Sequence, residues 1–187
     1  SGYQLVTTDA QSNTVVGTNA GNSFTGTDAT NNTLIGGYAG TAITTGDQNT
    51  SVGYNSSKSL TTGGSNTALG QAALYSSTTS DYNTAIGHQA LYHNVTGSQN
   101  TAVGQNALVN NTASNNTAVG REALKQNTSG SNNTSLGRYA LRANTTAGDN
   151  TAIGYVALYL NTTGASNVAI GSQALDANTT GDSRSEG

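Results

Sequence analysis

Cysteine, proline, methionine and tryptophan are absent from the 187 residues, and phenylalanine occurs once. The missing cysteines exclude disulfides, thiolate metal sites and cysteine nucleophiles. Large apolar side chains are scarce, since only 33% of the residues are hydrophobic and 5% are aromatic. A globular core of bulky side chains is therefore excluded, because their burial would not offset the entropy lost in ordering the chain.

Charge is scarce as well, at 8% of the residues, with six Lys plus Arg and a formal net charge of −3. Six cations leave no electrostatic footprint for nucleic acid, so no nucleic-acid partner is expected. No run of 18 apolar residues exists, so no membrane insertion of this segment is expected. Disorder is disfavoured too, because disordered chains are typically rich in charge and proline.

Threonine, asparagine and glycine fill the chain instead, with 31, 24 and 24 residues, and they recur periodically. The pattern Asn-Thr-x-aliphatic-Gly recurs in ten copies, with Val168 in place of threonine in the last, at spacings of 19, 17, 17, 17, 17, 16, 17, 17 and 17 residues. The anchoring asparagines are Asn13, Asn32, Asn49, Asn66, Asn83, Asn100, Asn116, Asn133, Asn150 and Asn167. A short unit repeated this many times is typical of solenoid architectures.

The columns of the repeat, numbered from the anchoring asparagine, are strongly restricted in residue type. The second column is threonine in nine copies, the fifth is glycine in all ten, and the eighth is alanine in nine. The ninth column is leucine from Leu74 onward, and the twelfth is mostly asparagine. The fourth column is always aliphatic, namely Val16, Ile35, Val52, Leu69, Ile86, Val103, Val119, Leu136, Ile153 and Ile170.

A unit of seventeen residues is too short for a helical-hairpin repeat, which needs about 33 or more. The segments Asn-Thr-Ala-Ile-Gly and x-x-Ala-Leu-x are short and end at turn signals, which is typical of strands. The repeat therefore predicts an all-β fold, a β-solenoid (parallel β-roll or β-helix) with one coil per copy. Coils stacked at about 4.8 Å would make a rod on the order of 48 Å long.

In a solenoid each column becomes a ladder of equivalent residues. We expect the aliphatic, alanine and leucine columns to fill a narrow core, and the anchoring asparagines to hydrogen-bond along the rod through stacked amides. Glycine in the fifth column allows a positive φ or a close backbone approach at a corner. In the central coils the expected ladder residues are Asn83, Asn100, Asn116, Asn133 and Asn150, Ile86, Val103, Val119, Leu136 and Ile153, and Gly87, Gly104, Gly120, Gly137 and Gly154.

The first three copies differ from the later ones in where their large apolar residue lies. Their ninth column is small (Gly21, Gly40 and Ser57), while their twelfth is large (Phe24, Ile43 and Leu60). Later copies have leucine in the ninth column and mostly asparagine in the twelfth. This exchange predicts that core volume is kept constant while its source moves.

The pattern divides the chain into a lead-in strand or connector at 1–12, a ten-coil solenoid at 13–183 and a C-terminal tail at 184–187. Each coil buries only about three apolar side chains. Their burial stabilises the coil by less than the conformational entropy lost in ordering its seventeen residues costs. We therefore expect several rods to associate side by side, as a threefold bundle with the small alanine and glycine columns facing its axis.

Two units carry a resemblance to known repeats: residues 83–87 (Asn-Thr-Ala-Ile-Gly) followed by Ala90, and residues 167–171 followed by Ala174. They resemble the YadA-like head repeats of trimeric autotransporter adhesins, and the longer unit at 150–164 is similar to tandem repeats of bacteriophage and viral tail fibres. The resemblance covers about residues 13–183 and implies a trimeric, left-handed β-roll fibre, extracellular, that attaches to a host cell or surface. The adhesin-head repeat is usually shorter, at about 14 residues, and the extra residues of this chain lie in the Thr-Gly turn.

Catalysis is not expected, and neither is a cofactor or a metal site. His88 and His93 are the only histidines, and no acidic partner recurs beside them. Asp47, Asp149 and Asp182 follow glycine in turns but do not form a calcium-binding nonapeptide, so a turn-stabilising role is expected for them.

Tyrosines are the candidate contacts to a receptor or glycan, because a ring with one wet edge can stack on another surface. They are Tyr75, Tyr92 and Tyr159 in the tenth column, and Tyr54 and Tyr155 in the sixth. Two alternatives stay open beside attachment. One is ice binding by threonine ladders, against which the usual Thr-x-Thr pair and a broad flat array are missing. The other is a passive spacer that sets fibre length.

Overall fold

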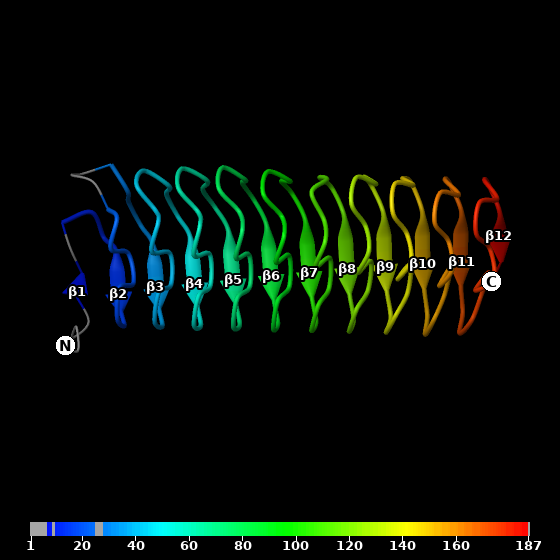
Figure 1. The fold of residues 1–187 in the computed structure, drawn as a ribbon, viewed down its shortest axis with the longest axis horizontal. Helices are drawn as coiled ribbons and strands as arrows, with labels where there is room; N and C mark the ends of the chain where they lie inside the picture. Colours follow the sequence, from blue (N-terminus) through cyan, green and yellow to red (C-terminus); the bar gives the residue numbers. More distant parts are fainter. Residues whose placement is uncertain (1–6, 9, 25–27, 187) are drawn as a thin grey trace.

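The computed structural model describes residues 7–8, 10–24 and 28–186, and in Figure 1 these form a straight rod of stacked coils with the first and last described strands at opposite ends. We call each copy of the repeat a coil. The strands are β1 (Thr7–Thr8), β2 (Thr14–Val16), β3 (Thr33–Ile35), β4 (Thr50–Val52), β5 (Thr67–Leu69), β6 (Thr84–Ile86), β7 (Thr101–Val103), β8 (Thr117–Val119), β9 (Thr134–Leu136), β10 (Thr151–Ile153), β11 (Val168–Ile170) and β12 (Ser185–Glu186). The predicted all-β solenoid of about ten coils is confirmed.

All the strands belong to one sheet, in which spatial order follows chain order from β1 to β12. From β2 to β12 every pair is parallel and in register, so that Thr84 pairs with Thr101 and Ile86 with Val103. At the two ends, β1 pairs antiparallel with β2 and β12 pairs parallel with β11, so the lead-in and the tail segments each add a strand.

Each coil contributes one strand of three residues, not the two strands that the sequence predicts. The Ala-Leu segment forms turns, because the residues of the seventh and ninth columns are left-handed, as at Gln89 (φ 56°) and Leu91 (φ 52°). This conformation is strained for leucine. Two features offset the strain: Leu91 is fully buried, and its N–H donates to the Ala107 carbonyl of the next coil at 3.1 Å.

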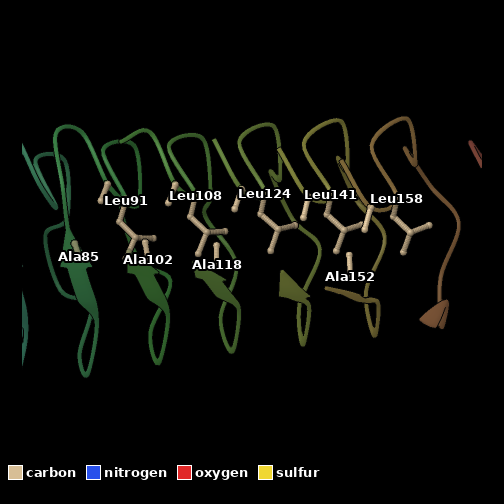
Figure 2. Close-up of a cluster of buried hydrophobic side chains, with 14 of the residues drawn as sticks. Ala85, Leu91, Ala102, Leu108, Ala118, Leu124, Leu141, Ala152 and Leu158 are labelled. Carbon is tan, nitrogen blue, oxygen red and sulfur yellow. The ribbon is translucent and has the colours of Figure 1, made fainter. Parts of the chain in front are cut away.

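The core of coils 4–10 consists of the third, eighth and ninth columns, as Figure 2 shows for the line of leucines from Leu91 to Leu158 above Ala85, Ala102, Ala118 and Ala152. The leucines from Leu74 to Leu158 are 0% exposed. Burial of each contributes roughly 1.5–3 kcal/mol to stability.

The prediction that the fourth column fills this core is wrong. Leu69, Leu136 and Ile170 are 46%, 47% and 48% exposed, and the other members are at best half-buried. The reason is strand alternation: the third column points into the narrow interior, so the second and fourth columns point out. The alanines that were expected to face a bundle axis lie inside each coil instead.

Two asparagine ladders run inside the rod, and the first was predicted. In it, Asn100 donates from its N–H and its Nδ2 to Asn83 Oδ1, at 3.0 and 3.2 Å. The second is formed by the twelfth column from Asn94 to Asn178, as where Asn161 Nδ2 donates to Asn144 Oδ1 at 3.0 Å. Both ladders bind the same acceptor within a coil, since the Gly164 carbonyl receives Nδ2 of Asn150 at 3.0 Å and of Asn161 at 2.8 Å. Every coil is thereby fastened to the next through buried amides.

Glycine in the fifth column is required by both conformation and space, as predicted. Gly104 has φ 134°, and a Cβ there would lie 2.6 Å from the carbonyl oxygen of Gly120 in the next coil. No side chain can be accommodated at that distance, so the corner can stack at the coil spacing only with glycine.

The predicted exchange of core volume is also confirmed. In the first coils Ile43 and Leu60 of the twelfth column are fully buried, and Phe24 packs beside them. They occupy the space that the ninth-column leucines fill from Leu74 onward.

Candidate binding face

Side chains of the sixth, seventh and tenth columns lie together on one long side of the rod, which we call the turn face. It follows the glycine corner, and its backbone is held by bonds between coils: Tyr139 N–H donates to the Arg121 carbonyl at 3.0 Å, and Val156 N–H to Arg138 at 3.1 Å. Residues one coil apart therefore stand at fixed spacing. The turn face carries most of the aromatic and cationic side chains of the chain.

Four of the five tyrosines expected as surface contacts make ring or cation contacts on this face. Tyr75 and Tyr92 stack with their centroids 4.8 Å apart and planes at 5°. Lys58 lies between two rings, with its Nζ 5.4 Å from the centroid of Tyr38 and 5.5 Å from that of Tyr75. Tyr54 remains 53% exposed while it meets the edge of Tyr38. This aromatic row spans coils 2–5.

A second group occupies coils 7–9, and we call it the Arg–Tyr array. Its nine residues form three rows of three, taken from the sixth, seventh and tenth columns. The first row is Arg121, Glu122 and Lys125, the second is Arg138, Tyr139 and Arg142, and the third is Tyr155, Val156 and Tyr159.

Three guanidinium groups surround the ring of Tyr139. The Cζ atoms of Arg138, Arg142 and Arg121 lie 4.5, 5.8 and 5.9 Å from its centroid. Arg138 Nη2 also donates to the Tyr139 hydroxyl at 3.0 Å, and this bond lowers the pKa of that phenol from its usual value.

Glu122 is the carboxylate of the array, and it is 8% exposed. Arg142 Nε donates to its Oε2 at 2.8 Å and Lys125 Nζ to the same atom at 3.2 Å. The bond from Arg142 is the main reason that the pKa of Glu122 lies below its ordinary value, although burial opposes the shift. Glu122 therefore stays ionised and holds Arg142 and Lys125 in place.

The outer side of the strands, which we call the sheet face, places the second and fourth columns side by side. Nine threonines and ten aliphatic side chains run along it in register. The second-column hydroxyls have no protein hydrogen-bond partner in the part of the chain that the structure describes. Most thirteenth-column threonines differ, since Thr128 Oγ1, for example, donates to the Thr145 carbonyl at 2.9 Å.

Aspartates in the turns bond to the coil before their own, so they link coils and do not cap their own turns as expected. Asp47 Oδ1 accepts the N–H of Thr30 at 2.7 Å, and Asp182 Oδ1 accepts that of Ala165 at 2.7 Å. Asp149 Oδ1 accepts the side-chain amide of Asn132 at 3.2 Å.

Within residues 7–8, 10–24 and 28–186, no group of three or more His, Asp or Glu could hold a metal ion. His88 and His93 are exposed, and no described helix is long and apolar enough to cross a membrane.

No protein-family model, curated protein or solved structure matches the chain. The functional interpretation therefore depends on its own residues. Sequence reasoning identified Tyr155 and Tyr159 of the array but missed its arginines and Tyr139. The signal was present: five of the six cations fall in the sixth or tenth column, the same columns that contain those tyrosines.

Proposed function

We propose that the chain is a structural and adhesive module of an extracellular attachment fibre, the shaft or head of a tail fibre or surface adhesin. In it, copies pack side by side as a homotrimer. The observation that carries the proposal is the aliphatic fourth column on the outside of the rod. A continuous apolar stripe on a soluble surface is typical of a protein interface.

The occupant that best matches this stripe is a second copy of the same chain. The stripe is linear and repeats once per coil through β2 to β11. A partner that packs against its whole length must repeat at the same spacing, about 4.8 Å, and be equally straight. Identical rods meet both conditions, and a threefold arrangement would bury all three stripes about one axis.

The rod supplies reach and repeated display. Coils fastened through amide ladders and glycine corners transmit load along the axis, while turn faces stay on the outside of the bundle. Three copies of each weak surface contact would then act together, and avidity would raise the overall affinity.

Adhesion can be measured with beads that carry the protein through its N-terminus. We expect the beads to be retained under flow on bacterial or epithelial cells and to be washed from albumin-coated glass. Equal retention on cells and albumin would contradict an adhesive role. A variant that lacks residues 83–99, one full coil, separates adhesion from spacing. If the chain is a passive spacer, the deletion shortens the rod by only about 4.8 Å. The beads are then retained no better on cells than on albumin-coated glass, both before and after the deletion.

Ice binding remains a second candidate because of the sheet face. The Thr-x-Thr pair is missing, as the sequence indicates, yet the structure does present a regular two-column surface of threonines and aliphatic residues. Its free hydroxyls could order water at the coil spacing. Thermal hysteresis that Thr117→Lys abolishes, and that Thr112→Lys in the thirteenth column leaves intact, would favour this function.

A further inference from the structure

The Arg–Tyr array concentrates positive charge on a chain that is otherwise acidic. It contains four of the six Lys and Arg residues and one of the nine acidic residues, a formal charge of +3 on a chain of −3. The single carboxylate of the array cannot pair with all four of its cations. The unpaired positive charge therefore lies within one small region of the turn face.

Two arginines carry the unpaired charge, because Glu122 is already engaged by Arg142 and Lys125. Arg121 Nη2 is 3.7 Å from Glu122 Oε1, too long for a hydrogen bond, and its side chain is 50% exposed. Arg138 is exposed, and among the described residues its guanidinium has a neutral tyrosine hydroxyl as its hydrogen-bond partner and no carboxylate within ion-pair distance. The guanidinium groups of Arg121 and Arg138, which we call the two forks, therefore keep N–H groups available to an incoming anion.

The two forks are held in position before any ligand arrives. Both are in cation–π range of the Tyr139 ring, and both belong to the sixth column in adjacent coils. Their backbones are fixed by the bonds between coils. Rigid placement reduces the entropy that binding would otherwise cost.

Tyrosine rings complete the array next to the forks. Tyr155, in the same column one coil further on, is 48% exposed, and Tyr159 receives a bond from Arg142 Nη1 at 3.4 Å. An arginine fork matches a carboxylate in two parallel hydrogen bonds, and an exposed ring offers a flat apolar surface. We infer that the Arg–Tyr array binds a carboxylate-bearing saccharide, such as a polymer of uronic acids, with the carboxylate on Arg121 and Arg138 and a sugar ring against Tyr155.

The size of the array favours a saccharide over a nucleic acid. Three coils span about 10 Å, and the sixth column of coils 4–6 continues with Gln71, His88 and Gln105. A polyphosphate strand would need cations along a longer track. Isolated carboxylates separated by neutral sugar atoms match two forks better.

This inference rests on the proposed attachment function, for which it names the ligand. The array and the stripe lie on different sides of the glycine corner, so the array remains accessible when copies pack through the sheet face. Loss of one site therefore need not affect the other.

The test uses the purified full chain and isothermal titration at low salt. The probe is an oligogalacturonate, and its methyl ester serves as a neutral comparison with the same sugar rings. A sulfated oligosaccharide and a thymidine oligonucleotide of equal charge cover the other anion sources. We expect the oligogalacturonate to bind most tightly and its ester to bind at least about tenfold more weakly, a difference of roughly 1.4 kcal/mol.

Two double variants with the same charge change isolate the array. Arg121→Gln with Arg138→Gln removes the unpaired forks, while Lys58→Gln with Arg184→Gln removes the two cations outside the array. We expect the first pair to weaken binding of the oligogalacturonate about tenfold and the second to leave it nearly unchanged. Circular dichroism checks that both pairs fold.

Three results would overturn the inference: no binding of the oligogalacturonate, equal weakening by both double variants, or tighter binding of the sulfated or nucleotide probe. Bead adhesion distinguishes this failure from failure of the proposed function. Beads that still adhere to cells after the array is removed leave the attachment function standing and locate its ligand site elsewhere.

Discussion

In coil 2 the interior is filled by Leu34 from the third column and Ile43 from the twelfth, while the ninth column holds Gly40. In coil 6 it is filled by Leu108 from the ninth column, while the third and twelfth columns hold Ala102 and Asn111. The buried apolar side chains accordingly form two separate clusters, one in coils 1–3 and one from coil 4 onward. Core volume is thus set by the cross-section and not by any single column.

The second arrangement adds a polar ladder to the core. With leucine entering from the ninth column, the twelfth is free for asparagine, and the amides from Asn94 to Asn178 bond from coil to coil. The junction between the two arrangements is rich in small hydroxyl side chains. In coil 3, Ser51 Oγ donates to Ser57 Oγ at 2.7 Å, and in coil 4 Ser77 and Ser80 contact each other.

The corner glycine is common to both regions, and its replacement is expected to have the largest effect. Gly36→Ala should destabilise the chain by on the order of 4 kcal/mol, because the Cβ would lie 2.7 Å from the Gly53 carbonyl oxygen at φ 129°. Gly37→Ala is the control, since its Cβ meets only the side chain of Tyr54 at 3.3 Å. Chemical denaturation measures both, and equal stability of the two variants would contradict the account of the corner.

Coil 4 allows one arrangement to be converted into the other. Leu74→Gly should cost about 3 kcal/mol, because it leaves a cavity in the core. Adding Ser77→Leu should recover most of this loss, since it supplies volume from the twelfth column as Leu60 does in coil 3. A double variant no more stable than Leu74→Gly in the same denaturation series would show that the columns are not interchangeable.

The asparagine ladder of the later region gives the next smaller effect. Asn144 Nδ2 donates to Asn127 Oδ1 at 2.8 Å and to the Ala147 carbonyl at 2.9 Å. Asn144→Ala should therefore cost about 2 kcal/mol, because buried partners lose their bonds. Asn110→Ala is the matched control, because Asn110 lies in the eleventh column and is only half-buried. Comparable thermal midpoints for the two variants would argue that the second ladder contributes nothing to stability.

Glu122→Gln should have the smallest effect, about 1 kcal/mol at neutral pH. The bond from Arg142 lowers the pKa of Glu122 in the folded chain. The stability that the ionised carboxylate contributes is therefore complete above the ordinary pKa of 4.5, and it is lost as the pH falls through the lowered pKa. Wild type should lose its advantage over the variant as the pH is taken from 7 to 3. Asp176→Asn makes the same charge change outside the array, and an identical pH profile for the two variants would contradict this role of Glu122.

Several features followed from the residues alone. The period, the corner glycine, the first asparagine ladder and the exchange between Ile43 and Leu108 columns could all be predicted, because each depends on residue type at a fixed spacing. The direction of the fourth column could not. In β2 and β3 the third and fourth columns are both apolar (Val15 and Val16, Leu34 and Ile35). Hydrophobicity therefore does not indicate which of the two columns points inward.

Two further features depend on backbone geometry that the sequence does not reveal. Leucine is rarely left-handed, so the turn at Leu91 was predicted as a strand. That turn brings the sixth, seventh and tenth columns together. Without it, Arg138 and Tyr139 could not be placed beside Arg142.

The proposed fibre requires the aliphatic fourth column to be an interface between copies and not part of a core. Light scattering coupled to size-exclusion chromatography tests it most directly, on the wild type, on Leu136→Lys and on the outward control Gln126→Lys. We expect a molar mass about three times 18.7 kDa for the wild type and the control, and a shift toward single chains for Leu136→Lys. A wild-type mass of 18.7 kDa would contradict it and would leave the sheet face open for ice.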